Sequence, residues 1–136
     1  MRPTEELEHE IRESGTPEAL SSPDFRPPEV TEYLNALLEE RGLTAGAVIL
    51  RCNLDRSYGY QMLNGTRRPT RDFLLLVSLA LALGEAEAQR LLKLAGRQPL
   101  YARNRRDAAL LYSLSHGLDL EAADELLGDL GEERLL

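Results

Sequence analysis

The chain has 136 residues and a net charge of −7, with 16 basic against 23 acidic side chains. This length fits one domain of ordinary size, and a core can form without disulfides or metals. Leucine and alanine dominate, and no segment alternates apolar with polar residues, so we expect an all-α fold. The lone Cys52 favours a reducing compartment, and the longest apolar run, 73–83, is shorter than the roughly 20 residues that span a bilayer. We therefore expect a cytoplasmic protein without a membrane partner.

Residues 1–27 form the first region, which we predict to be a flexible, acidic arm. Residues 1–15 favour at most a fraying acidic helix, because large apolar side chains are few. Prolines at 17, 23, 27 and 28 then interrupt regular structure. Two readings stay open for this arm: a solvated tail, or a cover for basic surface elsewhere in the chain.

Residues 28–96 begin with an amphipathic helix that stops at a glycine. Leu34, Leu37 and Leu38 have the i, i+3, i+4 spacing of one helical face. Gly42 follows where a helix C-cap belongs. Thr44 can then cap a second helix that runs through residue 52.

A tight turn and a third helix come next. Asn53 tolerates the left-handed backbone of a sharp turn, and Asp55 is a good N-cap. The third helix should span residues 56–63 and end at Asn64-Gly65. Two short helices joined in this way are typical of a helix-turn-helix, whose second helix enters the DNA major groove.

The charge is unevenly distributed along the chain. Residues 1–40 carry −8, residues 41–71 carry +5 and residues 72–136 carry −4. The basic surplus therefore lies in the segment that would face DNA, where counterion release favours phosphate binding. Its six arginines are Arg41, Arg51, Arg56, Arg67, Arg68 and Arg71.

The second half of the chain contains an internal repeat. Residues 71–101 align with 106–136 at a constant offset of 35, with 12 identical positions. Each copy predicts a helix, a short turn, a second helix and a glycine stop, as in helical-hairpin repeats. We read Gly84, Gly96 and Gly131 as helix stops. Since two copies do not make an independent solenoid, the C-terminal hairpin at 97–136 must pack on the helix-turn-helix region or on a second chain.

The ordered part of the chain resembles the Xre/Cro family of bacterial and phage regulators. The resemblance rests on the sequences at residues 39–44, 56–58 and 64–69 and on the Leu-rich helix from residue 71. Residues 57–61, Ser-Tyr-Gly-Tyr-Gln, are similar to a motif in small Firmicutes-type regulators. The resemblance implies a lambda repressor-like five-helix domain over 29–96.

The resemblance also implies a DNA-binding site. The residues that would face base edges are Arg56, Ser57, Tyr60 and Gln61. Arginine pairs well with guanine and glutamine with adenine in the major groove. Phosphates would be held by Thr44, Asn64, Arg67 and Arg68, which fix the register without reading sequence.

The chain departs from the family pattern inside the two-helix unit. The family places a small residue and a β-branched residue at the crossing of the two helices, whereas Ile49 and Gly59 stand there in the opposite order. We infer that Ile49 fills the space over Gly59, because an exchange that conserves core volume is tolerated. Ala45 also replaces a frequent glutamine.

The sequence offers little to an enzyme. His9, His116 and Cys52 are too far apart for metal-ligand spacing, and no phosphate-binding glycine loop occurs. We expect no cofactor and no catalysis. Two functions remain: a sequence-specific transcriptional regulator that binds double-stranded DNA as a homodimer, or a helix-turn-helix-shaped interaction module. In the second reading, the acidic arm or the C-terminal hairpin binds a protein partner, as in an antitoxin or signalling adaptor.

Overall fold

The structure is a computed structural model that describes residues 3–13, 17 and 29–136. Within these ranges the chain forms eight helices and no strand, which confirms the all-α fold class. The helices are α1 (Thr4–Glu13), α2 (Val30–Glu40), α3 (Ala45–Arg51), α4 (Arg56–Leu63), α5 (Arg71–Ala80), α6 (Glu85–Leu94), α7 (Arg105–Ser115) and α8 (Leu120–Asp129). The rest of the predicted arm, residue 17 excepted, lies outside the described residues.

Helices α3 and α4 begin where their capping residues predict. The Thr44 hydroxyl accepts a 3.1 Å hydrogen bond from the backbone N–H of Ala47 at the start of α3. The Asp55 carboxylate accepts one of 2.9 Å from the N–H of Tyr58 at the start of α4. Between the helices, Asn53 has φ 53°, the left-handed conformation expected for the turn.

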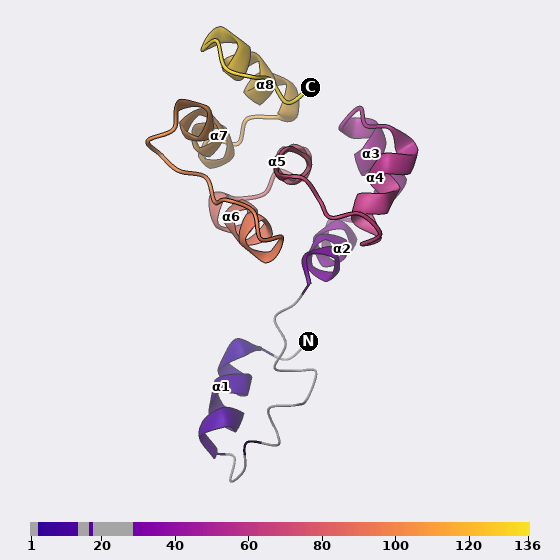
Figure 1. Ribbon diagram of the computed structural model, residues 1–136, viewed down its shortest axis with the longest axis vertical. Coiled ribbons are helices and arrows are strands. Elements are labelled where there is room, and N and C mark those ends of the chain that lie inside the picture. The colour runs from indigo at the N-terminus through magenta and orange to yellow at the C-terminus, as the bar shows by residue number, and fades with distance from the viewer. Residues whose placement is uncertain (1–2, 14–16, 18–28) are drawn as a thin grey trace.

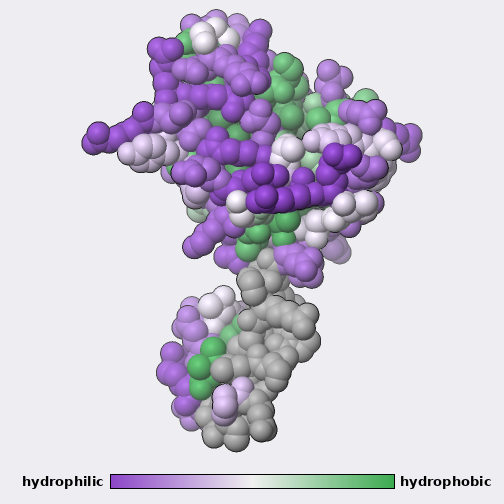
Figure 2. Space-filling model, in the orientation of Figure 1, coloured by the Kyte–Doolittle hydropathy of each residue, from purple (hydrophilic) through white to green (hydrophobic). Residues whose placement is uncertain are grey.

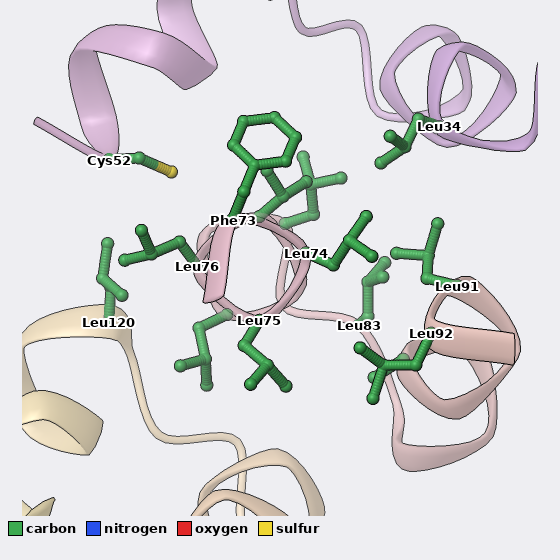
Figure 3. Close-up of a cluster of buried hydrophobic side chains, with 14 of the residues drawn as sticks. Leu34, Cys52, Phe73, Leu74, Leu75, Leu76, Leu83, Leu91, Leu92 and Leu120 are labelled. Carbon is green, nitrogen blue, oxygen red and sulfur yellow. The ribbon is translucent and has the colours of Figure 1, made fainter. Parts of the chain in front are cut away.

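Helix α5 is the centre of the molecule. Every residue from Phe73 to Leu79 is buried, so this helix is enclosed on all sides. Figure 3 shows its leucines and Phe73 pointing outward in several directions towards side chains of the surrounding helices. Helices α3, α6, α7 and α8 all contact α5, and α2 packs on α4 and α6 (Figure 1). The C-terminal hairpin is thus packed on the preceding helices of its own chain.

The internal repeat predicted from sequence is present in three dimensions. Helices α5 and α6 correspond to α7 and α8, and each pair ends at a glycine with positive φ, 68° at Gly96 and 70° at Gly131. Equivalent contacts recur at the same offset. The Gln89 side chain accepts a 2.7 Å hydrogen bond from the backbone N–H of Leu100, as Asp124 does from Leu135.

The interpretation of Gly84 as a helix stop is wrong. Helix α5 ends at the C-cap Leu81, and Ala82 takes the left-handed conformation with φ 54°. Gly84 is instead the N-cap of α6, with φ −74°. In the second repeat the residue equivalent to Ala82 is Gly117, at φ 65°. On either side of Ala82, Leu81 and Leu83 are buried, and the Leu83 N–H donates a 2.9 Å hydrogen bond to the Ser78 carbonyl, so the turn is anchored on both sides.

Candidate nucleic-acid interface

The crossing of α3 and α4 depends on a close contact between Ile49 and Gly59. A Cβ atom built on Gly59 would lie 2.7 Å from Cγ1 of Ile49, closer than real side chains approach. Ile49 and Gly59 are both buried. The inferred volume exchange is therefore confirmed: the side chain that the crossing requires comes from α3, and α4 leaves room for it.

The predicted base-contacting residues lie along the outer side of α4. Arg56 and Ser57 are exposed, whereas Tyr60 and Gln61 are half-buried. Met62, on the opposite side, is fully buried. Residues 57 and 61 are four apart on one helix and so are neighbours on its surface. The structure therefore brings Arg56, Ser57 and Gln61 to one accessible strip, whereas Tyr60 packs against the core with its hydroxyl beside Gly46 of α3.

Two arginines of this region lie over aromatic rings. The guanidinium carbon of Arg56 lies 5.7 Å from the centre of the Tyr60 ring, and that of Arg67 lies 4.9 Å from the Tyr58 ring. Nε of Arg67 also donates a 3.2 Å hydrogen bond to the Gln61 amide oxygen. For Gln61 to pair with a base through both amide atoms, this bond must be exchanged for one to DNA.

Three of the predicted phosphate-contacting residues, Thr44, Asn64 and Arg67, each make a different hydrogen bond within the chain. The Thr44 hydroxyl is used in capping α3, as described above. Asn64 is exposed, and its side-chain oxygen accepts a 2.9 Å hydrogen bond from the backbone N–H of Thr66. This bond shapes the loop after α4. Arg67 is exposed and adjoins the base-contacting strip through Gln61.

Arg68 points to a different part of the fold. Its guanidinium donates to the carbonyl oxygens of Ala95 and Gly96 at the end of α6, with distances from 2.9 to 3.2 Å. A cation is favourable there because the carbonyls of the last helical turn carry partial negative charge. We therefore assign Arg68 to holding the loop after α4 against α6.

Three more arginines of the basic segment are engaged in contacts within the chain. Arg41 donates a 2.9 Å hydrogen bond to the carbonyl of Leu81. Arg51 pairs with Glu121 on α8, which raises the pKa of Arg51 and lowers that of Glu121 through their hydrogen bond. Arg71 pairs with Asp107. Within the described residues, Arg56 and Arg67 are the two of the six whose guanidinium groups bind neither a carboxylate nor a backbone carbonyl.

A hollow that the sequence motifs do not predict lies beside this strip. It has a volume of about 300 Å³ and is lined by Gly46, Ile49, Leu50, Leu54 and Arg56. Leu50 is 82% exposed, the highest value among the large apolar side chains described. The sequence carried a signal for it. Residues 48–50 are three consecutive large apolar residues, and on a helix they cannot all face the same core.

Cys52 is buried, so its thiol does not reach the protein surface. The thiol lies at the end of α3 inside the core, and this burial raises its pKa to about 11. Over the described part of the chain, no three His, Cys, Asp or Glu side chains are grouped to hold a metal ion. No helix in those same ranges has both the length and the apolar character to cross a membrane.

No family model, curated protein or solved structure matches this chain.

Proposed function

We propose that this protein binds double-stranded DNA through α4, as a sequence-specific transcriptional regulator of the Xre/Cro type. One observation carries the proposal: Arg56, Ser57 and Gln61 share an accessible strip on a helix that follows a tight turn, with Arg67 beside it. This is the arrangement by which helix-turn-helix proteins read the major groove. The five helices from α2 to α6 also span the range that the resemblance to lambda repressor-like domains implies.

Arg56 and Gln61 are the residues to which we assign base recognition. Arginine donates two hydrogen bonds to guanine, and glutamine pairs with adenine, each contributing roughly 1 to 3 kcal/mol of discrimination. Ser57 and Tyr60 border the same edges. Arg67, Asn64 and Thr44 would then contact phosphates and set the register, while Arg68 keeps the loop in position.

The charge of the interface favours binding by two copies. Four of the six arginines already have partners within the chain, so one copy offers few free cations to phosphates. Each neutralised phosphate contributes to affinity through counterion release, and a small number gives weak binding. A homodimer on half-sites about one helical turn apart doubles the contacts. We therefore include a homodimer in the proposal.

A second candidate is an interaction module that keeps this shape but binds a protein. The specific observation in its favour is the engagement of Arg41, Arg51, Arg68 and Arg71 within the fold. The whole chain is acidic, and its basic segment loses most of its available charge in this way. Leu50 and the hollow beside it offer such a partner an apolar contact.

Selection of bound sequences from random duplex DNA at two salt concentrations separates the candidates. The DNA-binding proposal predicts one enriched motif, recovered more strongly at low salt. Arg56→Ala and Gln61→Ala should each lose the preference at one position of that motif. Arg105→Ala, which removes an exposed arginine on α7, serves as the control and should leave the motif unchanged. Absence of enrichment at both salt concentrations would reject DNA reading and favour the interaction module.

A further inference from the structure

Helix α1 is acidic and carries a small apolar face. Its sequence contains five glutamates and one arginine, for a charge of −4 with His9 neutral. Leu7 and Ile11 are four residues apart and therefore adjacent on one side of the helix. Ile11 is 49% exposed, and Figure 2 shows apolar surface on α1 among hydrophilic side chains. Figure 1 shows α1 standing apart from the body formed by α2–α8.

The hollow between α3 and α4 has the opposite character. Ile49, Leu50 and Leu54 line it, and Leu50 has 82% of its surface exposed. Arg56 also lines the hollow, and its guanidinium pairs with no carboxylate among the described residues. A ligand that fits here has an apolar side chain flanked by negative charge.

We propose that α1 docks in this hollow, with Ile11 and Leu7 against Leu50 and Leu54 and its glutamates facing Arg56. The contact joins an apolar pair to an apolar lining and places an acidic helix beside Arg56, the one cation among the lining residues. Amphipathic helices commonly bind grooves in this way. The docked helix would cover the end of the strip on α4.

The tether makes this docking an intramolecular event. Residues 14–29 separate α1 from α2, and 16 residues reach at most about 58 Å when extended. A domain of about 100 residues has a radius of gyration of roughly 13 Å, so every face of the body is within reach.

A second hollow competes for the same helix. It has a volume of about 600 Å³, lies between α2 and α6, and is lined by Tyr33, Glu87, Arg90 and Lys93 among others. Its two cations are accompanied by the Glu87 carboxylate, and Arg90 is stacked over Tyr33 at 5.3 Å. The net charge of its lining side chains equals that of the hollow at Arg56, but they include no leucine or isoleucine, whereas Ile49, Leu50 and Leu54 line the other hollow and offer the apolar contact that Leu7 and Ile11 require.

The docking of α1 does not depend on DNA, but its expected effect on DNA affinity rests on the proposed function. If α1 occupies the hollow in four molecules out of five, one fifth of the protein is competent, and the apparent dissociation constant for DNA rises about fivefold. Releasing α1 should recover that factor.

The test uses amide chemical shifts of the full-length, ¹⁵N-labelled protein without DNA. The double variant Leu7→Gln/Ile11→Gln removes the apolar pair and leaves the charge unchanged. His9→Gln, on the opposite side of α1, is the matched control. We expect the amides of Leu50, Leu54 and Arg56 to shift in the double variant and to stay in place in the control. Addition of 1 M salt, which shortens the screening length to about 3 Å, should move them in the same direction.

Three outcomes would overturn the proposal. Identical shifts at Leu50, Leu54 and Arg56 in all three proteins would mean that α1 does not reach the hollow. Shifts at Ala86 and Lys93 instead would place α1 between α2 and α6. A wild-type spectrum that changes with protein concentration at Leu50 would point to a second copy as the occupant. Because DNA is absent, failure here is distinct from failure of DNA binding.

Discussion

Arg71 binds the carboxylate of Asp107 through both terminal nitrogens, each at 2.9 Å. The reciprocal pair joins Arg106 to Asp72 at 3.0 and 3.2 Å. The Arg-Asp dipeptide that opens each repeat therefore binds its counterpart in the other copy. The two pairs differ in burial, since the side chain of Asp107 is 7% exposed and that of Asp72 is 45% exposed. Because the two pairs differ in burial, a variant in one pair can serve as the experimental control for the equivalent variant in the other.

Asp107→Ala should be strongly destabilising. It leaves the guanidinium of Arg71 without its buried partner, which costs about 3 kcal/mol in comparable pairs. Asp72→Ala removes the more exposed partner and should cost less than about 1 kcal/mol. Urea unfolding of the two variants measures both changes. Equal losses would contradict the assignment of Asp107 as the buried anchor.

The Asp107 carboxylate should also make the free energy of unfolding depend on pH in the acid range. Burial alone would raise the pKa of Asp107, but hydrogen bonds from Arg71 and from the backbone N–H of Tyr101 outweigh it and lower the pKa below its usual value. A carboxyl with a depressed folded pKa stabilises the protein above its unfolded pKa of about 3.9, and this contribution is lost as pH falls through the folded pKa. Unfolding free energies measured from pH 6 to pH 2 should fall less steeply for Asp107→Asn than for the wild type. Parallel curves would argue that Asp107 does not titrate in this way.

Gly59→Val should destabilise the crossing of α3 and α4. Its Cβ would meet Ile49, and overpacking of this kind costs typically 1 to 3 kcal/mol. The partner variant Ile49→Ala leaves a cavity by itself but makes room for the new side chain. A double-mutant cycle by thermal or urea unfolding should therefore give a favourable coupling between the two substitutions. An additive cycle, or an unchanged melting temperature for Gly59→Val, would contradict the contact.

Cys52 should resist thiol reagents while the protein is folded. Its burial in the core and its raised pKa both withhold the reactive thiolate at pH 8. We expect slow labelling in buffer and rapid, stoichiometric labelling in denaturant, followed by mass spectrometry. Rapid labelling of the native protein would show that the end of α3 opens readily.

The salt dependence of DNA binding tests which arginines are free to contact phosphates and which are already paired within the chain. Arg67→Ala should lower the slope of log K against log salt by about one, as expected for the loss of one phosphate contact. Arg51→Ala, which removes a cation already paired with Glu121, should change the slope much less. Fluorescence anisotropy with a selected duplex measures both. A larger effect for Arg51 would mean that its pair with Glu121 breaks when DNA binds.

Much of the local structure could be predicted because it depends on short-range signals. The caps at Thr44 and Asp55 and the left-handed Asn53 follow from residue types that satisfy helix ends or tolerate unusual backbone angles. The repeat was visible as a constant offset. The prediction that Gly84 stops a helix was wrong because glycine is found at both ends of helices, and Gly84 lies at the N-cap of α6.

The partners that the arginines bind within the fold could not be predicted from sequence spacing. Arg51 meets Glu121 across 70 positions, and Arg41 meets the Leu81 carbonyl across 40. Such pairs depend on how α8 and α5 are placed relative to the first helices, which local patterns do not encode. A count of charges along a segment therefore overestimated the cations available at its surface.

The enclosed position of α5 makes the candidate DNA-reading unit inseparable from the hairpin that follows it. Leu75 and Leu76 are buried, and α5 contacts both α7 and α8. A chain shortened at residue 96 would expose this side of α5 to water and lose the partner of Arg71. We expect one cooperative unfolding transition for residues 29–136, so that a fragment ending at residue 96 would not keep the reading helix on a stable scaffold.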